Sequence, residues 1–227
     1  MYSVYLADPG NPWFSLAYVQ ENSVTVLAAL REHLELTGQA VLIAVAIAIP
    51  LAVAAFWFRS LTGPILALTG VLYTIPSLAL FAFVAPYLGT GTQTVVVGLV
   101  LYALLLMVRS TLTGLDQVPA EVRDAARGMG YGRFRQLLRI DLPLALPGII
   151  TGVRLATVST VALVTVGVLV GHGGLGQLIL GGFRNNFYKA EIVTGTLLCV
   201  LLALVLDLLL AGVARLLTPW VRHGGAA

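Results

Sequence analysis

The residues whose types and spacing could do chemistry lie mostly between positions 118 and 148, where charged side chains accumulate in an otherwise apolar chain. Apolar residues recur there at intervals of three and four, which predicts an apolar stripe on a short helix that begins at Pro119. The stripe consists of Val122, Ala125, Ala126 and Met129. Apolar helix faces of this kind bind grooves on other proteins, so the expected chemistry is recognition. A helix that lies on lipid headgroups would show the same pattern.

Three glycines are expected to end this first helix, because glycine tolerates the positive φ angles of tight turns. They are Gly128, Gly130 and Gly132. A second short helix is expected after them, with Phe134, Leu137 and Leu138 on one face. Pro143 and Pro147 then mark the start of the next apolar run. Two short amphipathic helices between membrane spans predict a segment that inserts into a cleft of another protein.

The composition identifies the class of protein that carries these helices. Of the 227 residues, 59% are hydrophobic and 10% are charged, which is typical of a polytopic membrane protein. The net charge of +3 does not indicate nucleic-acid binding, because the excess basic residues lie in the loops expected on the cytoplasmic side of the membrane. One cysteine, Cys199, allows no intrachain disulfide. The sequence contains no His/Cys metal spacing, no nucleophilic serine elbow and no phosphate-binding glycine loop after a strand, so neither an enzyme nor a metal site is predicted.

Five apolar segments are long enough to cross ~30 Å of hydrocarbon as helices. We expect these spans at about 34–58, 61–87, 92–108, 142–170 and 190–217. The mixed residues before them are expected to form an interfacial helix on the bilayer surface, with a short further span over 13–30 as the alternative. The predicted division is an interfacial segment 1–33, a transmembrane domain 34–217 with a loop 118–141, and a tail 218–227.

The basic residues predict the orientation of the spans. If the 118–141 loop is cytoplasmic, nine basic residues fall on the inside and three on the outside, which is the usual positive-inside bias. The inside set is Arg59, Arg109, Arg123, Arg127, Arg133, Arg135, Arg139, Arg215 and Arg222, and the outside set is Arg31, Arg184 and Lys189. This orientation requires an odd number of spans, with the N-terminus outside and the C-terminus in the cytoplasm.

The loop resembles the EAA loop of binding-protein-dependent ABC importer permeases. Asp124-Ala125-Ala126 is followed by three residues, Gly130, nine residues, Ile140, one residue and Leu142-Pro143, which is the family's spacing throughout. The one departure is Asp124, where the family usually has Glu. The resemblance implies that this loop couples to an ATPase. The implied coupling residues are Glu121, Asp124, Ala125, Ala126, Gly130, Phe134, Ile140, Leu142 and Pro143.

Two further segments are similar to the osmoprotectant branch of these permeases, which imports glycine betaine, choline, carnitine and related solutes. The segment 73–80, Tyr-Thr-Ile-Pro-Ser-Leu-Ala-Leu, differs from that branch's segment only in its first residue, and 171–176, Gly-His-Gly-Gly-Leu-Gly, has His172 in place of Ala. Tyr73, Thr74, Pro76 and Ser77 are therefore candidates for the translocation pathway or its gate. His172, Gly173 and Gly174 are candidates for docking a binding protein.

Each of these candidates also has a purely structural interpretation. Pro76 bends a membrane helix whether or not it shapes a gate, and Thr74 or Ser77 could satisfy the carbonyl that it frees. The ring of Tyr73 could offer a π face to a quaternary ammonium group or could simply pack. His172 is too isolated for a metal site and is more typical of a loop residue.

Two opposite charges lie at matched depth in the last two predicted spans. Arg154 lies 11 residues beyond Pro143, roughly 16 Å up its helix, and Asp207 lies 10 residues before Leu217, roughly 15 Å up its own. Because an intramembrane charge needs a partner or a wet cavity, we expect an ion pair or a shared polar cavity on the pathway. Alternatively, Arg154 reaches toward the interface and Asp207 faces a second copy.

The resemblance implies an all-α polytopic protein with the MetI-like core of type I ABC importer permeases. The expected function is the permease subunit of an ATP-driven importer of osmoprotectants in the bacterial inner membrane. The expected partners are a cytoplasmic ATPase that uses ATP and Mg²⁺, an extracytoplasmic binding protein, a second permease and lipid, with no nucleic acid and no cofactor bound by this chain. A permease for methionine or another amino acid, and a secondary transporter, remain alternatives. The exact solute and the make-up of the pore are left open.

Overall fold

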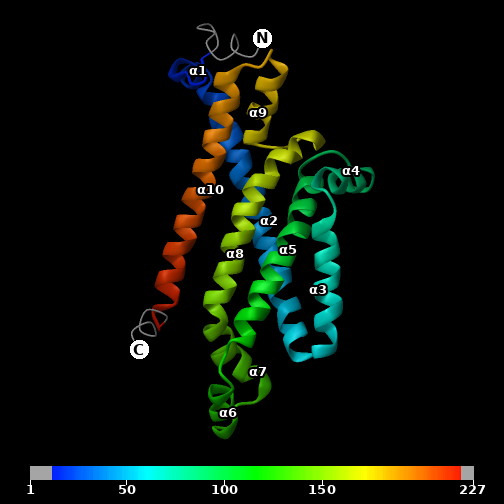
Figure 1. Cartoon of the computed structure of the whole chain (residues 1–227), viewed down its shortest axis with the longest axis vertical. Coiled ribbons are helices and arrows are strands. Elements are labelled where there is room, and N and C mark those ends of the chain that lie inside the picture. Colours follow the sequence, from blue (N-terminus) through cyan, green and yellow to red (C-terminus); the bar gives the residue numbers. More distant parts are fainter. Residues whose placement is uncertain (1–11, 221–227) are drawn as a thin grey trace, which may run out of the picture. The chain divides into compact units, whose positions relative to one another are not determined.

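The computed structural model describes residues 12–220, and this part of the chain is helical with no strand (Figure 1). The helices are α1 Leu16–Glu21, α2 Ser23–Trp57, α3 Arg59–Thr74, α4 Ser77–Leu88, α5 Thr92–Asp116, α6 Ala120–Gly128, α7 Arg133–Gln136, η1 Leu137–Asp141, α8 Leu142–Val164, η2 Thr165–Val170, α9 Leu175–Arg184 and α10 Lys189–Leu217. The predicted all-α membrane fold is confirmed.

The chain forms two compact units, and four helices contribute residues to both. The first unit contains the described residues up to Ala40, together with Pro76–Leu99 and Ser159–Val205. The second contains Val41–Ile75, Val100–Val158 and the described residues from Leu206 onward. The 118–141 loop and the Arg154/Asp207 pair belong to the second unit, whereas the 171–176 segment belongs to the first.

Within residues 12–220, four helical segments are long and apolar enough to cross a membrane, and a bent pair could supply a fifth span. The four are α2, α5, the continuous helical run Arg133–Val170 and α10. α2 begins at Ser23 and runs through residue 33, so no helix break marks the predicted boundary there, and the division into segments stays a prediction. The charges of Arg31-Glu32-His33 do not interrupt the helix: Arg31 pairs with Glu35 one turn later at 2.8 Å. With 35 residues, α2 is about 52 Å long, so it extends beyond a ~30 Å hydrocarbon core.

The predicted span 61–87 is not one bent helix. It consists of α3 and α4, which are bent by 98° at the break between them. Ile75 and Pro76 have extended ψ angles of 127° and 133°, because proline lacks the N–H of a helical turn and disfavours helical geometry in the residue before it. The Thr74 hydroxyl donates to the Val71 carbonyl at 2.8 Å, and the Tyr102 hydroxyl donates to the Ile75 carbonyl. Thr74 was an expected donor, whereas Tyr102 was not.

The segment after the loop also differs from the prediction. The second short helix, α7, is not separate, since the chain continues through the π-helical turn η1 directly into α8 (Figure 1). Pro143 and Pro147 therefore lie within α8. Pro143 follows the wide π turn, where an i→i−4 bond is already replaced, so its missing N–H does not end the helix.

Candidate functional site

The helix of the 118–141 loop begins and ends where its sequence predicts, to within one residue. Pro119 is the N-cap of α6 rather than its first helical residue, and α6 ends at Gly128. Gly130 follows with a φ of 80°, a left-handed conformation that favours glycine. Gly132 then forms the N-cap of α7. The predicted glycine turn is therefore confirmed, and Gly130 is the residue that requires it.

An ion pair between Arg123 and Asp141 fastens α6 to the turn that leads into α8. The Arg123 Nε donates to Asp141 Oδ1 at 2.9 Å, and the side chain of Asp141 is 3% exposed. A second guanidinium nitrogen of Arg123 donates to the Leu115 carbonyl, and the guanidinium stacks over the Phe56 ring at 4.7 Å. Gln136 Nε2 also donates to Asp141, at 3.3 Å. We call these residues the loop anchor: Arg123, Asp141, Gln136 and Phe56.

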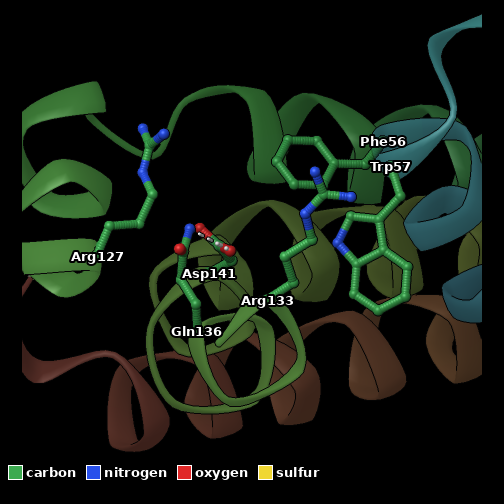
Figure 2. A pocket seen from close by; sticks show the side chains of 6 residues that line it. All are labelled: Phe56, Trp57, Arg127, Arg133, Gln136 and Asp141. Carbon is green, nitrogen blue, oxygen red and sulfur yellow. Dashed lines mark hydrogen bonds between the residues drawn. The ribbon is translucent and has the colours of Figure 1, made fainter. Parts of the chain in front are cut away.

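Figure 2 shows Gln136 and Asp141 facing each other in a pocket of about 240 Å³. The Arg133 side chain lies between them and the rings of Phe56 and Trp57, and Arg127 stands on the opposite side. The sequence analysis missed this anchor and counted Arg123 only among the basic residues on the inside. The available signal was weak: Asp141 is an acid between Ile140 and Leu142, two apolar positions of the motif.

The expected apolar stripes of the loop are divided between the protein interior and its surface. Ala126 is fully buried, and Leu137 packs in a cluster with Leu115, Ala145 and Ile149. Four larger side chains remain exposed, and we call them the loop patch: Val122 (38% exposed), Met129 (68%), Phe134 (65%) and Leu138 (49%). Apolar side chains exposed close together on short helices are typical of a protein interaction site.

The other motif residues lie around the anchor and the loop patch. Asp124 forms an exposed ion pair with Arg127, while Glu121 and Ala125 are exposed on α6. Ile140, Leu142 and Pro143 are half-buried where η1 meets α8. Their packing fixes the path from the loop into the membrane helix, whereas Asp124 and Glu121 are available to a partner.

Arg154 and Asp207 form the predicted ion pair between α8 and α10. Arg154 Nε and Nη2 donate to the two carboxylate oxygens of Asp207, both at 2.8 Å. The two side chains are 35% and 31% exposed, so the pair is half-buried. The prediction of a direct pair is confirmed, while its place on a translocation pathway stays a prediction. The aromatic candidates meet elsewhere in this unit: the rings of Tyr73 and Tyr102 pack edge to face at 5.6 Å.

The glycine-rich 171–176 segment is held against α2 by two adjacent side chains. His33 is fully buried and accepts the Leu175 N–H on Nδ1 at 3.2 Å. Its Nε2 therefore carries the proton and donates to the Val161 carbonyl at 3.0 Å. Glu32 accepts from His172 Nδ1 at 2.8 Å and from Gln177 at 3.0 Å. His172 is a loop residue, as expected, and its ring pairs with Glu32. Glu32 and His33 are functional candidates that the sequence analysis missed.

Two of the candidate docking glycines have no room for a side chain. A Cβ at Gly173 would lie 2.5 Å from the Val168 nitrogen. One at Gly174, where φ is 50°, would lie 2.6 Å from His33 Cβ. These glycines therefore permit the close approach of the segment to η2 and α2. Their part in docking a binding protein stays a prediction.

Replacing Asp141 with Asn should lower the free energy of unfolding by about 3–5 kcal/mol, because it leaves the Arg123 charge without a partner in a buried site. Thermal unfolding of the purified chain in detergent measures this effect. Asp116→Asn is the matched control, since Asp116 pairs with Arg59 at 2.8 Å but both side chains are exposed; we expect it to cost under ~1 kcal/mol. Equal losses of unfolding free energy in the two variants would contradict the stabilising role of the loop anchor.

A family model described as binding-protein-dependent transport system inner membrane component matches residues 23–223 of the chain. Similar curated proteins include the glycine betaine/carnitine/choline transport system permease protein OpuCD of Bacillus subtilis, which is 34% identical over 92% of this chain and 91% of its own length. The osmoprotectant import permease protein OsmW of Salmonella typhimurium is 35% identical over 90% and 97%. The choline transport system permease protein OpuBD of Bacillus subtilis is 33% identical over 90% of each chain.

The fold has a counterpart among solved structures. A chain of the MetNI methionine ABC transporter in an inward-facing conformation superposes with a TM-score of 0.78. The alignment covers 87% of this chain and 98% of that chain, at 21% sequence identity. At this level of identity the likeness concerns the fold alone.

Proposed function

This chain belongs to the family of binding-protein-dependent transport system inner membrane components, which makes it a permease subunit of an ABC importer, and we propose that its solutes are osmoprotectant quaternary ammonium compounds. The observation that carries the proposal is the set of relatives named as permeases for glycine betaine, carnitine and choline, which align over about nine-tenths of the chain. The osmoprotectant-like segments around Pro76 and His172 support it.

Family membership implies a division of labour among subunits. A permease of this kind is an inner membrane component and not an enzyme, and it works with a separate ATPase and a substrate-binding protein. The partner ATPase therefore uses the ATP. We further propose that the pore contains a second permease, and that the chain is oriented with the 118–141 loop and the C-terminus in the cytoplasm.

The proposed role of the 118–141 loop is to transmit movement of the ATPase to the membrane helices. The loop patch supplies apolar side chains for a cleft on the ATPase. The loop anchor ties α6 to the start of α8 through Arg123 and Asp141. A push on α6 would therefore move α8, which carries Arg154 toward or away from Asp207 on α10. Because these contacts connect the loop to Arg154 and Asp207, we propose that the two residues lie on the translocation pathway.

Solute competition tests the proposed substrate class. The importer, reconstituted in liposomes with its ATPase and binding protein, should take up labelled glycine betaine, and excess choline or carnitine should compete. Methionine should not compete, because it lacks the permanent cationic nitrogen that aromatic cages recognise. Uptake of methionine without uptake of any quaternary ammonium solute would overturn the proposal, while leaving the assignment to the permease family intact.

A further inference from the structure

A polar groove lies between α5 and α8, near the end of α5 that leads into the loop. It has a volume of about 390 Å³, which is within the ~300–1,000 Å³ range of ligand pockets. The side chains that line it are Arg109, Ser110 and Thr113 from α5, Gln117 directly after α5, and Pro147 and Thr151 from α8. No acidic side chain is among the described residues that line it.

The groove exists because two glycines bring the helix backbones together beneath it. A Cβ at Gly148 would lie 2.8 Å from Gly114 Cα, and one at Gly114 would lie 2.8 Å from the Ala145 carbonyl oxygen. Neither position can carry a side chain, so the helices approach closely at this point. The polar side chains one turn to either side of Gly114 then surround a space that no side chain of the described chain fills.

The groove presents hydrogen-bond donors and a positive charge without a counter-ion. Arg109 is exposed and has no ion-pair partner within residues 12–220. By contrast, Arg59, Arg123 and Arg127 at the same end of the second unit each have an acidic partner. The Thr151 hydroxyl donates to the Pro147 carbonyl at 2.8 Å, whereas Ser110, Thr113 and Gln117 keep their donors available. Donors around an arginine form a site for an anion with several acceptor oxygens.

The depth of the groove is that of a lipid headgroup. Arg109 is the first charged residue after the apolar run 92–108, and it lies seven residues before the end of α5 at Asp116. This corresponds to about 10 Å along the helix. α5 has 25 residues, or about 37 Å, so its final turns extend past a ~30 Å hydrocarbon core. Arg109 therefore stands near the boundary between acyl chains and headgroups.

We propose that this groove binds the phosphate headgroup of an anionic phospholipid. Arg109 binds the phosphate oxygens, and Ser110, Thr113 and Gln117 donate further hydrogen bonds. Basic pockets between transmembrane helices bind anionic headgroups in this way. The inference goes beyond the proposed transport function. If the chain has the proposed orientation, the lipid belongs to the cytoplasmic leaflet; lipid binding itself does not depend on that orientation.

Lipid binding to the purified importer tests the proposal. In native mass spectrometry, the wild-type complex should retain phosphatidylglycerol at least about tenfold more strongly than phosphatidylcholine. Both lipids carry a phosphate, but the choline group of phosphatidylcholine is cationic and finds no acidic partner within the described part of the groove that holds Arg109. Arg109→Gln should remove this preference, and Thr113→Val should weaken it. Arg215→Gln is the matched control: Arg215 is also an exposed arginine in the final part of a membrane-spanning helix, but it does not line the groove.

Four results would overturn the proposal. Equal losses in Arg109→Gln and Arg215→Gln would show that arginines at helix ends attract lipid without a built site. If Arg109→Gln keeps the full preference for phosphatidylglycerol over phosphatidylcholine, the groove is not the lipid-binding site. Dissociation of the permease from its partner subunits in Arg109→Gln, with lipid retention unchanged, would assign the groove to a protein contact. Competition by inorganic phosphate alone, without an effect of lipid, would identify a free anion as the occupant and would also overturn it.

Discussion

Gly130→Leu should reduce solute uptake to less than about a tenth of the wild-type rate, while the ATPase continues to hydrolyse ATP. Gly130 has a φ of 80°, and no atom lies within 4 Å of the position of an added Cβ. Leucine would therefore meet no clash, and the effect would come from the backbone, since a left-handed conformation costs about 1–2 kcal/mol for a residue with a Cβ. An altered turn would displace α6 from its place beside η1 and separate ATP hydrolysis from transport. Parallel measurement of uptake and phosphate release in liposomes gives the result.

Two variants distinguish backbone strain from a general effect of bulk in the loop. Gly132 also has no atom within 4 Å of an added Cβ, but its φ is −68°, so Gly132→Leu should retain most of the uptake. Gly130→Asn should also retain more uptake than Gly130→Leu, because asparagine tolerates the left-handed conformation better than leucine does. Wild-type uptake in Gly130→Leu would contradict the coupling role of the turn.

Neutralising either Arg154 or Asp207 should lower uptake and the yield of folded protein by about tenfold, because a single charge within a membrane span is left without its partner. The two side chains are joined by two hydrogen bonds of 2.8 Å. Arg154→Leu combined with Asp207→Leu should therefore lose less than the sum of the two single losses. Uptake and the amount of monodisperse protein after purification provide two independent measurements.

The exchange of the two charges is the matched control for this pair. Arg154→Asp combined with Asp207→Arg keeps one charge of each sign at the same depth, and it should restore folding more than it restores uptake. Folding depends on the presence of a pair, whereas a pathway depends on which charge lies on which helix. Strictly additive losses in the single and double neutral variants would contradict the coupling between the two residues.

Features set by local pattern were predictable from the sequence. The apolar runs identify the helices α2, α5, α8 and α10, and the glycines after α6 identify the turn at Gly130. The Arg154/Asp207 pair was one of the predicted arrangements, because helix rise converts residue counts into depth and a charge within a membrane span needs a partner or a water-filled cavity.

Contacts between residues far apart in the sequence were not predictable. Arg123 and Asp141 are separated by 18 residues, with a turn and a π-helical segment between them, so spacing gives no indication that they meet. His33 meets Leu175 across 142 residues. The partners of Glu32 and His33 lie on the remote 171–177 segment and at Val161, so nothing in the sequence indicated that these polar residues would lie inside a continuous helix. Pro76 predicts a bend but not its angle of 98°, and the Tyr102 hydroxyl that donates to the Ile75 carbonyl comes from a residue 27 positions away.

Cross-linking from the loop patch tests the central claim, that the 118–141 loop couples this permease to its ATPase. Cys199 is the only cysteine, so Cys199→Ala gives a background into which single cysteines can be placed. Met129→Cys, at a side chain that is 68% exposed, should cross-link to the ATPase subunit, and the yield should change when ATP is bound. Leu208→Cys, at an equally exposed position (69%) within α10, should not cross-link to it. Failure of Met129→Cys to reach the ATPase in an importer that still transports its solute would contradict the account.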